Sequence, residues 1–294
     1  AYRIGLRLQS QNLEGVGQML EAIQAPDWEA TSRMNYCMAL ISRTELSREL
    51  QEQLQRTRAA IQKISAPTTR AAMSIDFAAV LIDSGKQTEA TEALLAAQEL
   101  VNRASLEDAN RIEMQLRIAK VLAAMERPTE FADLMHNIET AVIDLEDPER
   151  AKSQLAMVGI YLENNELTQA ESAADKMKEP SFRCQALAQI GTRYAQLLEL
   201  QRSRETFTKA YAEAMQVRDI LDLDTVYSKG GAVRFVAQRQ GECDLEGLAY
   251  FLDESTSANI VAYGGIGAAE ALDPAAAESA KKFGRLPEAV VDDI

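Results

Sequence analysis

The chain has 294 residues with a formal net charge of −14, and 47 % of its residues are hydrophobic. This composition provides for a large core and excludes a disordered polar chain. The acidic balance argues against binding to nucleic acid or adsorption to an anionic membrane surface, because both need a basic protein surface.

Residue usage predicts an all-α protein. Glycine (14 residues) and proline (7) are scarce, while alanine, leucine, glutamate and glutamine, which favour helix, dominate. No stretch alternates β-branched residues as a sheet would require, and none reaches the roughly 18 to 20 apolar residues that span a bilayer. The three cysteines, Cys37, Cys184 and Cys243, contain no C-x-x-C pair, which argues against a disulfide framework or a zinc site.

The first predicted helical pair begins at the N-terminus. The opening segment AYRIGLRLQ already has a helical rhythm. If residues 12–15 form an inter-helix turn, the first helix begins before Ala1, so we expect the natural protein to extend upstream. Localisation stays open between the cytoplasm and export through a signal that precedes this segment. The second helix of the pair covers 13–23 and ends before Pro26.

The boundaries of the later helices are predicted from local signals in chain order. Capping side chains and prolines mark the expected starts, which are Asp27, Thr44 with Ser47, Thr88 with Glu92, Pro128, and Asp147 with Pro148. One helical pair follows Pro67, and another ends before Pro180. Short segments rich in glycine, asparagine, aspartate or proline mark the expected turns, which are 83–86, 127–128, 164–165, 240–242 and 273–274.

A recurring position predicts about eight helical pairs. Ser203 lies early in a second helix and serves as the reference, and the comparable positions are Gly15, Leu50, Ala90, Phe131, Ala170, Asp244 and Ala277. Successive positions lie roughly 33 to 41 residues apart, as stacked helical hairpins require. No low-complexity linker interrupts the series. We therefore expect one continuous domain over 1–283 and a short acidic tail, 284–294.

The clearest pair lies within 185–210. In the first helix, apolar or small residues at i, i+3, i+4 and i+7 spacing form one face, which consists of Leu187, Ile190, Gly191 and Tyr194. In the second helix, the corresponding face consists of Ser203, Phe207 and Ala210. Small residues let antiparallel helices approach closely, and large residues fill the adjacent groove. This pattern resembles the tetratricopeptide repeat family. The segment 147–180 resembles it moderately, and the other pairs share its rhythm, although the tryptophan common in that family is absent from every pair.

The resemblance implies a right-handed αα-superhelix with a concave surface lined by the first helix of each pair. It further implies a non-catalytic scaffold that binds a peptide or a partner helix in that groove. The family's groove positions correspond to Gln185, Thr192 and Gln196 in one pair and to Lys152 and Glu163 in the preceding one, with positive charge added by Arg193, Lys229 and Arg234. The alternative for all these positions is a solvated helix face.

Two features are compatible with catalysis or ligand sensing. The only histidine, His136, has Asp133 and Glu139 three residues to either side, on one helix face. A zinc site, however, needs more nitrogen or sulfur ligands than one histidine supplies. The segment 259–267, NIVAYGGIG, has the pattern of a strand entering a phosphate-binding turn but lacks the βαβ context. Close helix–helix contact at its glycines is the alternative.

The sequence therefore predicts a protein-binding scaffold with no catalytic residue, cofactor or metal. A structural or self-assembly protein is the alternative function, and a ligand-sensing or catalytic protein is a third. A protein or peptide is the expected partner, without nucleic acid or membrane insertion, and the oligomeric state stays open.

Overall fold

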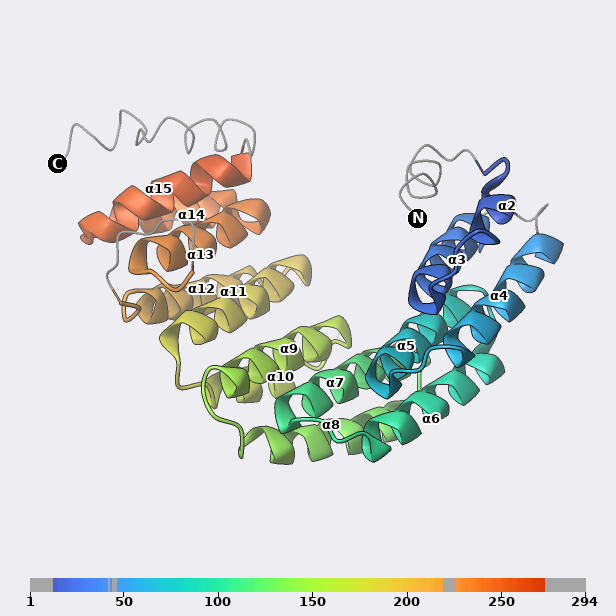
Figure 1. The fold of residues 1–294 in the computed structure, drawn as a ribbon. Coiled ribbons are helices and arrows are strands. Elements are labelled where there is room, and N and C mark those ends of the chain that lie inside the picture. Colours follow the sequence, from blue (N-terminus) through green and yellow to red (C-terminus); the bar gives the residue numbers. More distant parts are fainter. Residues whose placement is uncertain (1–12, 42, 44–46, 219–225, 273–294) are drawn as a thin grey trace. The chain divides into compact units, whose positions relative to one another are not determined.

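The computed structural model describes residues 13–41, 43, 47–218 and 226–272. This part of the chain contains helices and no strand, which confirms the predicted all-α class (Figure 1). The chain divides into two compact units, Ala1–Leu145 and Glu146–Ile294, and each is described by itself. The single domain expected over 1–283 stays a prediction.

Unit 1 is a series of helices in which each helix contacts the next one in the chain. The described helices are α2 (Val16–Leu20), α3 (Pro26–Ile41), α4 (Ser47–Gln62), α5 (Pro67–Asp83), α6 (Gln87–Arg103), α7 (Asp108–Ala124) and α8 (Pro128–Val142). Contacts also join α3 to α5 and α5 to α7. These three helices therefore form one layer, and α4, α6 and α8 pack against it.

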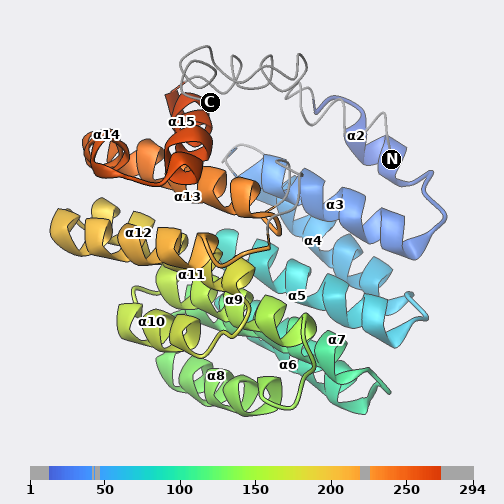
Figure 2. The ribbon, with the colours of Figure 1, turned by 90° about the vertical axis from the view of Figure 1, so that its left-hand side faces the viewer.

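Unit 2 has the same organisation (Figure 2). Its described helices are α9 (Glu149–Glu163), α10 (Leu167–Asp175), α11 (Pro180–Gln196), α12 (Leu200–Ala214), α13 (Lys229–Cys243), α14 (Leu245–Glu254) and α15 (Ala258–Leu272). Contacts between α9 and α11, α11 and α13, and α13 and α15 add to those between consecutive helices. The first helices of successive pairs thus lie side by side, which is the packing that a helical repeat predicts.

Several helix boundaries lie where local signals predict them. Pro67, Pro128 and Pro180 each occupy the first position of a helix, where the missing backbone N–H leaves no bond unmade. Gly85 joins α5 to α6 with φ +76°, and Asn165 joins α9 to α10 with φ +60°. Glycine and asparagine adopt this left-handed conformation more readily than other residues.

Other boundaries differ from those expected. Asp27 does not cap α3, because the helix begins at Pro26 and Asp27 lies in its first turn. Thr88 likewise lies inside α6, which begins at Gln87 without a side-chain cap. The turn expected at 240–242 is also wrong, since α13 continues to Cys243 and the chain reverses at Asp244. A capping residue favours a start nearby, but packing of the whole helix determines the first residue.

Gly241 lies within α13 at a point where another helix packs closely against it. A Cβ atom at this position would lie 2.8 Å from the Ala271 Cβ of α15. The glycine therefore marks a close approach of two helices rather than a turn.

The recurring position is occupied consistently in both units. It is the fourth residue of α4, α6, α8, α10 and α12, namely Leu50, Ala90, Phe131, Ala170 and Ser203. The last four are buried. Gly15 and Asp244 do not belong to the series, because they precede α2 and α14. The fourth residue of α14 is the fully buried Leu248. The expected opening helix, the turn at 273–274, Ala277 and the tail lie outside the described residues.

The pair α11–α12 shows why small residues recur. The Ser203 hydroxyl donates a 2.8 Å hydrogen bond to the Gly191 carbonyl oxygen of the facing helix. A Cβ atom on Gly191 would lie 3.0 Å from the Phe207 ring, so only glycine leaves the ring its full space. The fully buried Phe207 belongs to a core that also includes Tyr211, Val236 and Leu248.

The glycines of α15 provide close helix contacts, as one of the two interpretations of NIVAYGGIG predicted. The whole segment lies within the helix, so the strand and phosphate-turn interpretation is wrong. A Cβ atom on Gly264 would lie 2.6 Å from the Leu252 side chain of α14. A Cβ atom on Gly267 would lie 2.3 Å from the Arg234 carbonyl oxygen of α13.

Two glycines of α15 should respond oppositely to alanine. Gly267→Ala should lower the free energy of unfolding by about 1 to 3 kcal/mol, because the new methyl group meets backbone that cannot move easily. Gly265 has open space where its Cβ would be. Gly265→Ala should therefore raise stability by about 0.5 to 1 kcal/mol through helix propensity. Urea unfolding followed by circular dichroism tests both, and equal effects would contradict the packing described.

Candidate binding surface

All eight residues predicted to line a groove lie in unit 2. They are Gln185, Thr192, Arg193 and Gln196 on α11, Lys152 and Glu163 on α9, and Lys229 and Arg234 on α13. Because α9, α11 and α13 contact one another in sequence, these residues belong to one layer of neighbouring helices.

The centre of this layer is a polar stripe along α11. Gln185, Thr192, Arg193 and Gln196 fall on one helix face and are half-buried or exposed. The opposite face carries the buried Leu187, Ile190 and Tyr194 side chains, which anchor the helix in the core. The sequence period thus separates a packed face from an accessible one.

Hydrogen bonds within the helix hold part of the stripe. The Gln185 amide donates to the Ser181 carbonyl oxygen at 2.8 Å, and the Thr192 hydroxyl donates to the Ala188 carbonyl oxygen at 2.9 Å. Arg193 donates to the Gln196 side chain at 2.9 Å and also bonds Asn165 in the α9–α10 turn. Gln185 and Gln196 each keep donor or acceptor capacity that a peptide backbone can use.

The flanking helices contribute less positive charge than the residue types suggest. Lys152 is exposed and pairs with Glu149 at 3.1 Å on its own helix. Arg234 forms a 2.6 Å ion pair with Glu270 of α15, and the two side chains are only 13 % and 6 % exposed. The Arg234 charge is therefore neutralised within the protein. The surface centred on α11 is mainly polar, and Arg193, which bonds the neutral Gln196 and Asn165 side chains, adds positive charge to it.

A second ion pair orders the end of α13, and sequence analysis did not identify it. Arg204 donates two hydrogen bonds to the Asp244 carboxylate, from Nε at 2.6 Å and from Nη2 at 2.9 Å. The same carboxylate accepts the Gly247 N–H at 3.0 Å and so caps α14. The hydrogen bond from Arg204 holds the pKa of Asp244 below its ordinary value of 3.8. Residues forty apart in the chain gave no local signal of this pairing.

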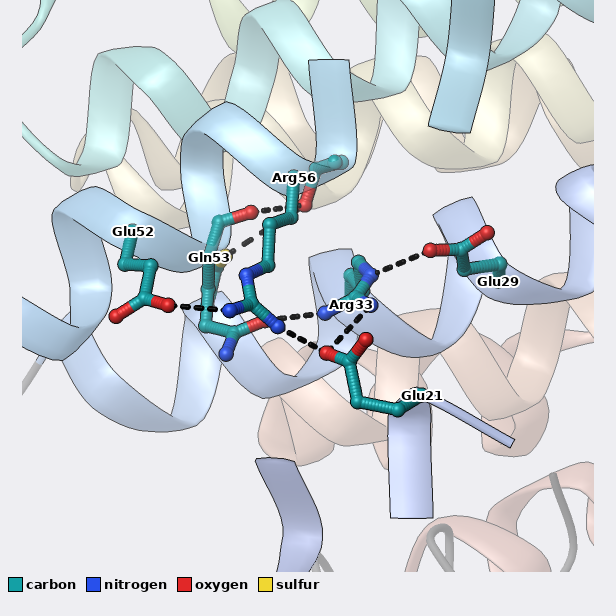
Figure 3. Close-up of polar contacts among 8 residues, drawn as sticks. Glu21, Glu29, Arg33, Glu52, Gln53 and Arg56 are labelled. Atoms are coloured by element: carbon teal, nitrogen blue, oxygen red, sulfur yellow. Dashed lines mark hydrogen bonds and ion pairs between the residues drawn. The ribbon is translucent and has the colours of Figure 1, made fainter. Parts of the chain in front are cut away.

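Unit 1 contains a buried arginine that sequence analysis also missed (Figure 3). Arg33 of α3 is 2 % exposed and bonds Glu29 at 2.9 Å, Gln53 of α4 at 2.6 Å and Glu21 at the end of α2 at 3.2 Å. It therefore joins three helices. A signal was present, because Arg33 occurs on an apolar helix face with a glutamate four residues before it.

Arg56 extends this cluster toward the solvent. It pairs with Glu21 and, along its own helix, with Glu52. The hydrogen bond from Arg33 is the main cause that lowers the pKa of Glu21 from 4.5. Arg33 is itself buried and bonds side chains of its own chain, so the cluster is a structural connection among α2, α3 and α4.

The three cysteines and the histidine of the described residues lie in different surroundings. Burial raises the pKa of the Cys37 and Cys243 thiols to about 11 and that of Cys184 to about 12. All three thiols are therefore protonated at neutral pH and are poor nucleophiles. His136 is exposed, and no group of three or more potential metal ligands gathers within the described part of the chain. None of the helices that the structure describes has the length and apolar character needed to cross a bilayer.

Comparisons of this chain with models of protein families, with curated proteins and with solved structures found no match. The similarity of its motif to tetratricopeptide repeats therefore stays a resemblance.

Replacing Arg33 should destabilise unit 1 far more than replacing its neighbour Arg56. Arg33→Met leaves Glu29 and Gln53 without a partner in a buried environment and should cost about 3 kcal/mol. Arg56 is 42 % exposed, and Arg56→Met should cost less than about 1 kcal/mol, as for other surface pairs. Urea midpoints of the two variants test the difference. A fully stable Arg33→Met protein would show that the cluster is dispensable.

Loss of the Asp244 charge should reduce the dependence of stability on pH in the acidic range. Asn keeps the helix cap but not the ion pair, so Asp244→Asn should cost about 2 kcal/mol at pH 7. Because folding lowers the pKa of Asp244, its stabilisation is present above the ordinary value of 3.8 and is lost as the pH falls through the lowered value. The gap between the wild type and the variant should therefore close in acid. Glu246→Gln, at a 96 % exposed side chain, is the control.

Proposed function

We propose that the chain is a tetratricopeptide-like helical-repeat scaffold that binds a peptide or a partner helix across the α9–α11–α13 layer. In this proposal the two units continue one right-handed αα-superhelix of about eight hairpins. The partner lies along the first helices, in the groove that such a superhelix forms on its concave side.

One observation carries the proposal. The α11 face between α9 and α13 presents a row of polar side chains, half-buried at Gln185 and Thr192 and exposed at Gln196, on a well-packed support. A rigid support reduces the ordering cost of binding. Amide and hydroxyl groups suit recognition of a peptide backbone, whereas the Arg234–Glu270 pair leaves less charge for a terminal carboxylate.

A structural or self-assembly role is the alternative, and a separate feature favours it. The turn from α11 to α12 exposes Leu198 by 84 %, with Leu197 and Leu200 exposed by 40 % and 43 %. Three neighbouring exposed leucines form an apolar edge on which a second copy can pack.

Blocking the α11 stripe should weaken peptide binding. A displayed library of random peptides selects ligands, and fluorescence anisotropy measures their affinity. Gln185→Tyr, Thr192→Tyr and Gln196→Tyr together should weaken binding at least about tenfold, because the new rings fill the space over the stripe. Gln196→Tyr alone, at an exposed residue, should give a smaller loss and guards against a folding defect in the triple variant.

The matched control places the same three tyrosines at Gln201, Thr208 and Lys209, which are exposed on α12. This control should bind like the wild type. Equal binding by both triple variants would contradict the proposed surface. Light scattering on the same samples measures the oligomeric state. A protein that stays monomeric at high concentration would exclude the self-assembly alternative.

A further inference from the structure

A second surface, apolar in character, lies in unit 1. A pocket of about 330 Å³ opens between α6 and α8, with α7 below it. The buried Leu94, Ile118 and Leu134 side chains come from the three helices and form its floor. Leu95 lines its edge and is 62 % exposed. The exposed leucine is therefore continuous with an apolar recess rather than isolated on a polar surface.

A neighbouring groove of unit 1, between α4 and α6, differs from the α6–α8 groove in its ion pairs. Between α4 and α6, above α5, lies a smaller pocket of about 210 Å³. Arg58 of α4 spans that groove to Glu89 at 3.4 Å and to Glu92 at 3.8 Å on α6. No ion pair of the described residues that line the larger pocket joins α6 to α8. The α6–α8 groove is thus open where the α4–α6 groove is bridged.

The charged side chains at the rim of the larger pocket have a net negative charge. The exposed Asp133 of α8 has no hydrogen-bond or ion-pair partner among the residues that the structure describes. Arg127 and Glu130 pair with each other one helical turn away, so their charges offset. With a net charge of −14 on the whole chain, a second copy would bring more negative charge to this rim, whereas a basic partner is attracted.

We propose that the α6–α8 pocket binds an amphipathic helix of a partner protein that inserts two large apolar side chains between α6 and α8 and places a lysine or arginine beside Asp133. The pocket volume lies near the lower end of the roughly 300 to 1,000 Å³ typical of binding sites. It suits a few side chains, and anchors spaced i and i+4 on a helix fit a groove between two helices. This site is independent of the α11 stripe, because the two lie in different units.

The test uses the full chain and a displayed library of alanine-based peptides. The peptides are about 14 residues long, enough for helix formation, and are randomised at i, i+4 and i+7 on one face. Selected peptides should carry two large apolar residues and one lysine or arginine. Their affinities are measured by fluorescence anisotropy on the wild type and on the variants.

Each variant has a matched control in unit 1. Leu95→Gln should weaken binding about tenfold, because an apolar wall is lost, whereas Ile143→Gln, at a 69 % exposed residue outside the pocket, should not. Asp133→Asn should weaken binding about threefold at low salt and reduce both the basic preference and the salt dependence. Asp144→Asn, another exposed carboxylate of unit 1, should leave both unchanged.

Three results would overturn the proposal: no enriched pattern, enrichment of acidic peptides, or equal affinities for the Leu95→Gln and Ile143→Gln proteins. If only the α11 tyrosine variants abolish binding of the selected peptides, the peptides occupy unit 2 and the pocket proposal fails while the proposed function stands. If only the Leu95 and Asp133 variants act, the pocket proposal stands without the α11 surface.

Discussion

The close approach of antiparallel helices is the constraint on which the rest of the structure depends. At the α11–α12 pair, Gly191 leaves room for the Phe207 ring, and Ser203 bonds a backbone carbonyl across the interface. A larger residue at either small position would push the helices apart. Because the two helices of a pair lie close together, neighbouring pairs can also pack against each other. In unit 2, α9 contacts α11, and α11 contacts α13. Stability is consequently spread along each unit rather than concentrated at one centre.

Ion pairs and hydrogen bonds with at least one buried partner add a second constraint, on how helices slide past one another. Arg33 joins α3 to α2 and α4, Arg204 joins α12 to the start of α14 at Asp244, and Arg234 joins α13 to Glu270 of α15. Apolar contacts alone tolerate small shifts along a helix. A charge that loses its partner in a buried environment is costly, so these pairs penalise the shifted arrangements.

The two candidate surfaces differ because the two faces of the helix layers differ. First helices in unit 2 present amides and a hydroxyl group, which favour contacts with a peptide backbone. In unit 1, the second helices α6 and α8 flank a pocket over α7, and the exposed Leu95 and the exposed Asp133 carboxylate lie at its edge. Polar recognition provides orientation and apolar recognition provides affinity, so a partner of one surface would not be expected to suit the other.

The sequence by itself determined the all-α class, the pairing of consecutive helices, the helix start at Pro128 and the boundaries next to Pro67 and Pro180, because periodicity and proline act within a few residues. The resemblance to tetratricopeptide repeats pointed to Gln185, Thr192 and Gln196, and their role in binding stays a prediction. Only the tertiary structure decided that Gly241 lies inside a helix, that Arg33 is buried, and that Arg234 is neutralised by Glu270, 36 residues away. The α6–α8 pocket likewise depends on the tertiary packing. Each of these features depends on which distant residues the packing brings together, and a local pattern carries no information about that.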